Sequence, residues 1–187
     1  ELDNVNVYDF DMQVRPTFDL RSMGTYDQNY NGENRRRLRM EYRSEGWIYV
    51  SHSHFYILPP SLYQTQHPDW YSKDGTQICM TNEEMRVEFT RNLIELIKNN
   101  PTAKYCMLGM QDRNTYCDCE KCSAEVALYN ESGVQTRFTN KVAKDVQNWL
   151  DTYQPGREFT LFTYAYFKTT AAPVSDDNGV YTVLDPS

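Results

Sequence analysis

The sequence predicts an α/β fold in which parallel strands alternate with helices. Two long segments carry apolar residues at helical spacing, and short segments with strand character lie between and around them. Several of these short segments are apolar on both faces, which is typical of parallel strands covered by helices. A chain of 187 residues is long enough for a real core, so we expect one domain over residues 1–187.

The first half of the chain is expected to form two strands and a helix. Strand character occurs in residues 14–21 (VRPTFDLR) and 46–53 (GWIYVSHS). The helix is predicted to begin at Thr81, which pairs with Glu84 as a capping box, and to end at the sequence Asn-Asn-Pro of residues 99–101. Its apolar face consists of Met85, Phe89, Leu93, Leu96 and Ile97.

The second half repeats the alternation. Strands are predicted at residues 104–112 (KYCMLGMQD), 159–167 (FTLFTYAYF) and 179–185 (GVYTVLD). A helix is predicted over residues 133–156, ended by Pro155-Gly156. Its apolar face consists of Val134, Phe138, Val142, Val146, Trp149 and Leu150. A helix between successive parallel strands gives right-handed β/α units.

Polar side chains come at or near the carboxyl ends of the predicted strands. In parallel sheets and barrels these ends face one mouth, where ligands bind. A complete (β/α)8 barrel takes ~250 residues, so four or five strands amount to roughly half of one. The residues at these ends are Arg21, His52, Asp112, Tyr164, Tyr166 and Asp185.

Charge and hydropathy exclude two classes of partner. The formal net charge is −7 and the isoelectric point about 5.0, so nucleic-acid binding, which needs clustered Lys and Arg, is not expected. No apolar run approaches the ~20 residues of a membrane span. No signal peptide is visible, and the chain begins with Glu and ends on TVLDPS, so we expect a fragment of a longer protein.

Four of the five cysteines suggest a structural centre. Cys117, Cys119 and Cys122 form a C-x-C-x-x-C cluster, and Cys79 precedes the first long helix. Four thiolates suit a tetrahedral Zn²⁺ site, although a lone Cys79 replaces the usual second C-x-x-C. A disulfide, or reduced thiols packed in a loop, are the alternatives. Cys106 lies in an apolar strand and is expected in the core.

Several polar and aromatic residues are candidates for a site. Asp112 ends an apolar strand, where a carboxylate is either a general acid or base or the cap of its own turn. His52 and His54 would share one face of a strand, as ligand-binding or as structural histidines. Tyr164 and Tyr166 would either stack on a sugar ring or pack in the interior.

The arginine run of residues 35–39 would either clamp a carboxylate or sulfate or form a solvated loop. The sequence has no G-x-G-x-x-G, Walker A, G-x-S-x-G or H-E-x-x-H motif. Nucleotide use, serine hydrolysis and zinc-protease chemistry are therefore not supported.

The stretches SHSHFYILPPSLYQTQHPDWYS, TQICMTNEEM, MQDRNTYCDCEKC, TRFTNKVAKDV and LFTYAYFKTTAAP together resemble a bacterial family. It is domain-of-unknown-function family 4838, which has been grouped with glycoside hydrolase family 163. The resemblance covers about residues 15–185, and the cysteine cluster joined to the FTNKVA helix is its most specific part.

The resemblance implies a (β/α)8 TIM barrel of glycoside hydrolase type, of which this chain holds only part. It also implies an exported protein that acts on glycans containing N-acetylhexosamine, as a retaining, substrate-assisted endo-β-N-acetylglucosaminidase. In such chemistry one carboxylate orients the acetamido group and a second acid protonates the leaving oxygen.

Matching positions transfer the roles residue by residue. Asp112 falls on the family's acidic position, and His52, Tyr164 and Tyr166 on positions expected to contact sugar. Arg39, with Arg37, lies where the family has an R-x-R pair, and Arg21 is a further candidate for binding substrate. Gln111 replaces the family's Asn, and the partner acid is either Asp185 or lies beyond Ser187.

The resemblance also favours a meeting of Cys79 with the other three cysteines, as a staple for the loop after Asp112. The alternatives to an enzyme are a carbohydrate-binding domain that does not cleave, and an interaction module stabilised by the cysteine cluster.

Overall fold

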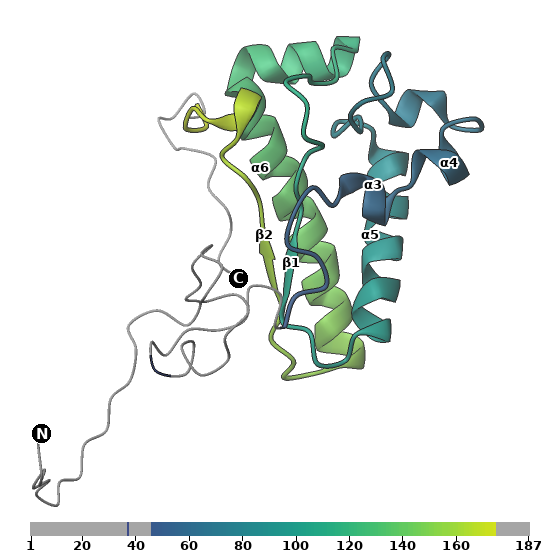
Figure 1. Cartoon of the computed structure of the whole chain (residues 1–187), viewed down its shortest axis with the longest axis vertical. Helices are drawn as coiled ribbons and strands as arrows, with labels where there is room; N and C mark the ends of the chain where they lie inside the picture. The colour runs from purple at the N-terminus through teal and green to yellow at the C-terminus, as the bar shows by residue number, and fades with distance from the viewer. Residues whose placement is uncertain (1–36, 38–45, 175–187) are drawn as a thin grey trace, which may run out of the picture. The chain divides into compact units, whose positions relative to one another are not determined.

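The structure is a computed structural model that describes residue 37 and residues 46–174 (Figure 1). The chain divides into units of residues 1–43 and 44–187, and every element described here belongs to the second unit. The expectation of a single domain stays a prediction. In order the elements are α3 (His54–Ile57), α4 (Pro60–Tyr63), the 3₁₀ turn η1 (Pro68–Trp70), α5 (Glu83–Asn99), β1 (Tyr105–Met107), α6 (Glu120–Tyr153), β2 (Thr160–Phe162) and the 3₁₀ turn η2 (Phe167–Thr169).

Three extended segments pair in parallel, in the order in which they occur in the chain. β1 pairs with β2, with Cys106 opposite Leu161. On its other side β1 pairs with the segment at Trp47, whose neighbour Ile48 donates its N–H to the carbonyl of Tyr105 at 2.8 Å. The strands predicted within residues 104–112 and 159–167 therefore form, but only in their first halves. Within residues 46–53 the pairing is a single bridge at Trp47. Those predicted at residues 14–21 and 179–185 lie outside the described residues.

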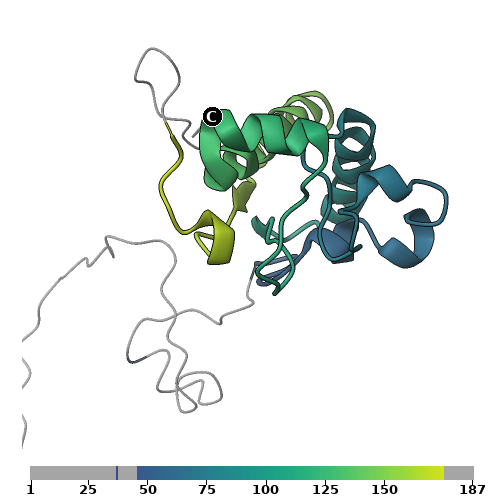
Figure 2. The ribbon, with the colours of Figure 1, turned by 90° about the horizontal axis from the view of Figure 1, so that it is seen from above.

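Helices α5 and α6 connect these strands and lie on the same side of them (Figures 1 and 2). Their predicted apolar faces form the core, because Met85, Phe89 and Leu93 of α5 and Val142 of α6 have no exposed surface. From the strands, Cys106 and Leu108 join the same cluster, which confirms Cys106 as a core residue. The succession of strand, helix and parallel strand is the unit that a barrel repeats. The (β/α)8 barrel itself stays a prediction.

The start of α5 differs from the expectation. Asn82, not Thr81, is the N-cap, and its side chain accepts a hydrogen bond from the N–H of Met85 at 3.0 Å. Thr81 turns elsewhere, with its hydroxyl oxygen 3.1 Å from the sulfur of Cys122. The capping-box prediction is therefore wrong at this residue, because the cysteine cluster takes up the Thr81 side chain. The predicted end of the helix at Asn99 is confirmed.

Helix α6 begins at Glu120, well before the predicted start at residue 133. It has a kink at Asn130, whose backbone is non-helical (φ 56°, ψ 177°). The Asn130 side chain accepts a hydrogen bond from the N–H of Gly133 at 2.9 Å, so Asn130 acts as the N-cap of the second part. The first part escaped prediction because its residues lack an apolar repeat. Within the described residues, no helix is long and apolar enough to cross a membrane.

Candidate functional site

The structure brings Asp112, His52, Tyr164 and Tyr166 together just beyond the carboxyl ends of the paired strands. The Tyr166 hydroxyl donates to the Asp112 carboxylate at 3.0 Å. The ring centroids of His52 lie 5.5 Å from Tyr164 and 5.9 Å from Tyr166. This group of four residues, from three segments of the chain, is called the Asp112 centre below.

Two members of the centre are fixed by backbone carbonyls. His52 donates from Nδ1 to the carbonyl of Met110 at 2.5 Å, so Nε2 is the ring nitrogen left to contact a ligand. Tyr164 donates its hydroxyl to the carbonyl of Val50 at 3.1 Å. These bonds tie the segments that follow the first, second and third strands to one another.

Gly109 permits this close approach. A side-chain carbon at residue 109 would lie 2.7 Å from the Ser51 carbonyl oxygen and 2.7 Å from the Tyr164 ring. The Gly109 carbonyl also accepts from the N–H of His54 at 3.1 Å. Residue 109 therefore has to be glycine for the first and third segments to close over the second.

The two histidines do not share a strand face, so that expectation is wrong. The chain leaves the strand before Ser51, and His54 opens helix α3. His54 is completely buried, edge-on to Phe89 and Phe138, with no hydrogen-bond partner for either ring nitrogen among the described residues. Burial, aided by the nearby His52, lowers the pKa of His54 to about 3.

Tyr164 and Tyr166 also lie beyond the strand that was expected to hold them, because β2 ends at Phe162. Tyr166 keeps its place through the turn η2, where the Thr169 hydroxyl accepts from the N–H of Tyr166 at 3.2 Å. The hydrogen bond to Asp112 raises the pKa of Tyr166 above its ordinary value, because ionised Tyr166 would repel the carboxylate. Tyr166 therefore stays a donor at neutral pH.

Four cysteines meet in a second cluster. The sulfur of Cys79 lies 3.6 Å from that of Cys119 and 3.7 Å from that of Cys122. With Cys117 they form a set whose sulfurs all lie within 4.8 Å of one another. The expectation that Cys79 meets the other three is thus confirmed, and all five cysteines of the chain are free.

The spacing of the sulfurs matches metal coordination rather than a disulfide. Tetrahedral coordination with metal–sulfur bonds of about 2.3 Å places sulfurs about 3.8 Å apart, whereas a disulfide needs about 2.05 Å. Hydrogen bonds from Cys117 and Cys122 hold the pKa of Cys79 well below its usual range, and the same contacts raise the pKa of Cys117. These contacts favour negative charge on the sulfur of Cys79, and the four cysteines could hold a metal ion.

Helix α6 supports the cluster at its first residue. Cys119 is the N-cap, and its sulfur accepts from the N–H of Cys122 at 3.5 Å. Partial positive charge at a helix N-terminus stabilises a thiolate there. The C-x-x-C spacing therefore places two sulfurs on the same side of one helix start.

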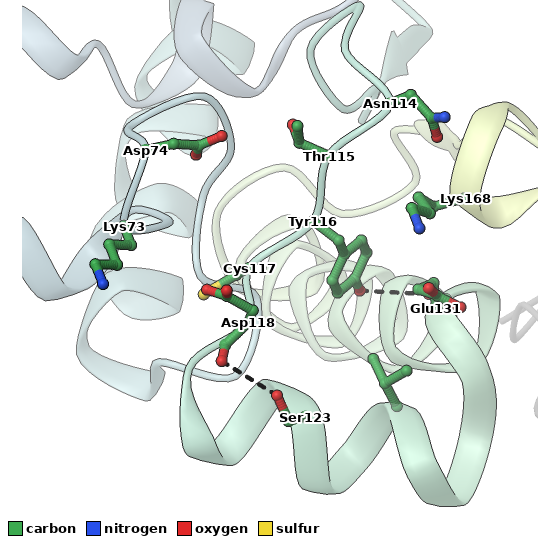
Figure 3. Close-up of a pocket in the computed structure, with 11 residues that line it drawn as sticks. Lys73, Asp74, Asn114, Thr115, Tyr116, Cys117, Asp118, Ser123, Glu131 and Lys168 are labelled. Atoms are coloured by element: carbon green, nitrogen blue, oxygen red, sulfur yellow. Dashed lines mark hydrogen bonds between the residues drawn. The ribbon is translucent and has the colours of Figure 1, made fainter.

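Two cavities adjoin the cysteine cluster. One, of about 640 Å³, is lined by Lys73, Asp74, Asn114, Thr115, Tyr116, Cys117, Asp118, Ser123, Val126, Glu131 and Lys168 (Figure 3). The other, of about 620 Å³, is lined by Asp69, Tyr71, Lys73, Cys79, Asn82, Cys117, Asp118, Cys119, Glu120 and Lys121. Neither lining includes Asp112. The chain between Asp112 and Cys117 nevertheless forms one wall of the first.

Other predicted site residues lie outside the described part of the chain. These are Arg21, Arg39 and Asp185. Among the described residues, the hydrogen-bond partner of Asp112 is Tyr166 and not a second carboxylate. The identity of the partner acid stays open between Asp185 and the region beyond Ser187.

Two features of the site escaped sequence reasoning. Thr81 contacts the cysteine cluster, although its position suggested a helix cap. Phe167 has a left-handed backbone (φ 48°), uncommon for a bulky residue, and its ring lies 4.1 Å from that of Tyr166. No sequence signal marks such a backbone at an aromatic residue.

Comparison with known proteins finds a family model that matches the chain. No curated protein and no solved structure matches it significantly. The model of the family described as "Domain of unknown function (DUF4838)" matches residues 1–181, which is nearly the whole chain. The chain therefore belongs to the DUF4838 family of domains of unknown function.

Proposed function

We propose that this domain cleaves glycans containing N-acetylhexosamine, as an endo-β-N-acetylglucosaminidase-like glycoside hydrolase. The observation that carries the proposal is the Asp112–Tyr166 hydrogen bond of 3.0 Å, set among the aromatic rings of the Asp112 centre. A carboxylate beside aromatic faces and hydroxyls suits a polar ring-shaped ligand. Its place beyond the ends of parallel strands is where α/β proteins bind ligands.

The proposed roles follow from the contacts. Asp112 would orient and stabilise the substrate's acetamido group, whose carbonyl oxygen would attack the anomeric carbon as the glycosidic bond breaks. A second acid, outside the described residues, would protonate the departing oxygen, and water would then displace the acetamido oxygen, which gives net retention. Tyr166 would keep Asp112 in position while its ring, which is 39% exposed, contacts sugar. His52 would accept a sugar hydroxyl at Nε2, and Tyr164 would supply a ring face.

The test is cleavage of complex and high-mannose N-glycans by the full-length protein and its Asp112→Asn variant. Asn keeps the size of the side chain and an oxygen for Tyr166 but lacks the charge. We expect a fall of about 100-fold or more in kcat/KM. Asp151→Asn, at an exposed residue of α6, is the matched control. Unchanged cleavage by Asp112→Asn would remove Asp112 from the chemistry.

A second candidate is glycan binding without cleavage. It is favoured because a tyrosine, not a second acid, is the described partner of Asp112. Retaining glycosidases place two carboxyl groups about 5–5.5 Å apart. If the full-length protein binds N-glycans but releases no product, and Asp112→Asn weakens that binding, the domain is a carbohydrate-binding module.

We further propose that the cysteine cluster holds a structural zinc ion. Four thiolate ligands at tetrahedral spacing leave no open position for water or substrate, as in structural sites. Zinc there would fix the loop from Asp112 to Cys117 without entering the reaction. Supporting this, Cys79 approaches from before α5 and the other three from the start of α6, so the ion would link two segments distant in sequence.

Metal analysis of the purified full-length protein tests this. We expect one zinc per chain, lost in Cys79→Ser and kept in Cys106→Ser. Cys106 is the matched control because it is buried in the core, away from the cluster. A chain that carries no metal, with a disulfide between Cys79 and one of the other three, would contradict the proposal.

A further inference from the structure

The two segments that form the Asp112–Tyr166 pair run on into the wall of one cavity. Asn114 comes two residues after Asp112, and Lys168 two residues after Tyr166. Both line the cavity of about 640 Å³ beside the cysteine cluster (Figure 3). Two residues of chain span at most about 7 Å. The cavity therefore begins close to the Asp112 centre, and its volume is in the range of pockets for small ligands.

Several polar groups of the lining are uncommitted. Five lining residues make no side-chain hydrogen bond or ion pair to another described residue. They are Lys73, Asn114, Asp118, Glu131 and Lys168. Other lining groups are bound, as where the Tyr116 hydroxyl donates to the Glu131 carbonyl at 3.3 Å. The cavity thus offers free donors and free acceptors together.

This mixture indicates the chemical class of the ligand. Three carboxylates, of Asp74, Asp118 and Glu131, face two ammonium groups, so an anion such as a phosphate is disfavoured. A sugar hydroxyl both donates and accepts, so it satisfies an ammonium and a carboxylate equally well. The Tyr116 ring and Val126 add an apolar part to the wall, as sugar rings require.

Phe167 lies between the Asp112 centre and the cavity in sequence. Its ring is 39% exposed and contacts the ring of Tyr166, and its left-handed backbone is held by the bonds of Thr169 to the Tyr164 and Tyr166 carbonyls. A strained backbone at a bulky exposed residue points to function rather than packing. An aromatic face at this point would support a sugar chain that passes from Tyr166 to Lys168.

We propose that the cavity is a second saccharide subsite, continuous with the Asp112 centre, and that Asn114 and Lys168 contact the sugar at their junction. The inference rests on the proposed function, because it extends the same glycan beyond the sugar held at Asp112. The cavity would then bind the part of the glycan that follows the sugar held at Asp112.

Calorimetric titration of the full-length protein with N-acetylglucosamine and with its β-1,4-linked trisaccharide tests the proposal. We expect the trisaccharide to bind about tenfold or more tightly than the monosaccharide. Lys168→Ala and Asn114→Ala should each weaken the trisaccharide about fivefold or more and leave the monosaccharide within about twofold. Lys144→Ala, at an exposed lysine on α6, is the control and should change neither.

The outcomes separate this inference from the proposed function. Equal affinity for the two sugars, or no effect of either variant, overturns the subsite, while cleavage sensitive to Asp112→Asn would leave the proposed function standing. Binding of a zwitterionic dipeptide in place of both sugars overturns the subsite and weighs against the proposed function. The exposed positions of Asn114 and Lys168 let both variants fold, and their melting temperatures should match the parent.

Discussion

Tyr166 donates its hydroxyl to the carboxylate of Asp112 at 3.0 Å, across 54 residues of sequence. The two residues follow neighbouring parallel strands, β2 and β1, and each lies in the turn after its strand. Because both ends emerge at the same edge, the pair forms without a long connecting loop. Its geometry therefore depends on the turns rather than on the strands.

Tyr166→Phe should weaken glycan cleavage while leaving the fold intact. The change removes one hydrogen bond to a charged group, worth about 1.5–3 kcal/mol when well formed. Because the site is exposed, we expect the low end, which is a fall of about tenfold in kcat/KM. The free energy of unfolding should change by less than about 0.5 kcal/mol.

The size of that fall, compared with the loss in Asp112→Asn, checks the assignment. If Tyr166 positions Asp112, its removal must cost less than the removal of the charge itself. The doubly substituted protein should be no worse than Asp112→Asn alone, because the two residues act together. Additive losses would indicate that Tyr166 acts on the glycan independently of Asp112.

Gly109→Ala should disturb the Asp112 centre through the backbone. The added carbon would lie 2.7 Å from both the Ser51 carbonyl oxygen and the Tyr164 ring, so one of them must move. Overpacking of this kind costs about 1–3 kcal/mol of unfolding free energy. Urea unfolding would measure the loss.

The partner in that clash can be identified by a second substitution. Tyr164→Ala combined with Gly109→Ala removes the ring contact but keeps the contact with the Ser51 carbonyl. We expect part of the lost stability to return relative to the sum of the single changes. Simple additivity would show that the backbone contact alone sets the cost.

Sequence patterns predict the helices well and the loops poorly. Phe89 and Phe138 repeat with their neighbours at helical spacing, and the buried faces of α5 and α6 follow that repeat. Asn130 carries no such signal, because Asn is common in helices, loops and caps and does not by itself mark a positive φ. The helical part of α6 before it was missed because its residues lack an apolar repeat.

The site is predictable where residue types restrict the chemistry. Cys79 and the C-x-C-x-x-C cluster were expected to meet, and they do. His54 was not predictable, because a buried histidine and a ligand-binding histidine look alike in sequence. The Tyr166–Asp112 contact required the turn η2, whose left-handed Phe167 only a structure reveals.

Metal removal should loosen the loop between Asp112 and Cys117. If zinc holds the cluster, its binding energy contributes to folding, so chelation should lower the melting temperature. Hydrogen exchange of residues 112–122 should rise after chelation, while that of α5 residues such as Leu93 stays slow. Exchange that rises equally in both regions would mean that the ion stabilises the whole domain rather than the loop.

His54 should make the free energy of unfolding decrease as the pH falls below about 6.5. Its pKa is about 3 in the folded protein, against the 6.5 of an ordinary histidine, so the unfolded chain binds a proton that the folded chain excludes. Above pH 6.5 the residue has no effect, and below it each pH unit costs up to about 1.4 kcal/mol. Between pH 7 and pH 5 we expect a loss of about 2 kcal/mol from this residue.

His54→Leu should remove that dependence, because Leu has a similar volume and no charge. Urea unfolding at pH 7 and pH 5 would compare the two proteins. The variant should lose about 2 kcal/mol less than the parent over this range. Parallel pH profiles for parent and variant would show that the pKa of His54 is not lowered in the folded protein.

Asn130 should stabilise the kink of α6 in two ways. Its side-chain oxygen caps Gly133, and its side-chain N–H donates to the Ala172 carbonyl at 2.7 Å, which anchors the segment after η2. Asn130→Ala removes both bonds and puts Ala, which tolerates positive φ less well than Asn, at a φ of 56°. We therefore expect a loss of about 2 kcal/mol of unfolding free energy. Glycine tolerates this backbone, so Asn130→Gly, which removes the same bonds, should cost less unfolding free energy than Asn130→Ala.

Because the anchored segment follows Tyr166, both variants should also raise KM for glycans more than they lower kcat. A larger loss for Gly than for Ala would mean that the side-chain bonds and the positive φ do not determine the stability of this kink.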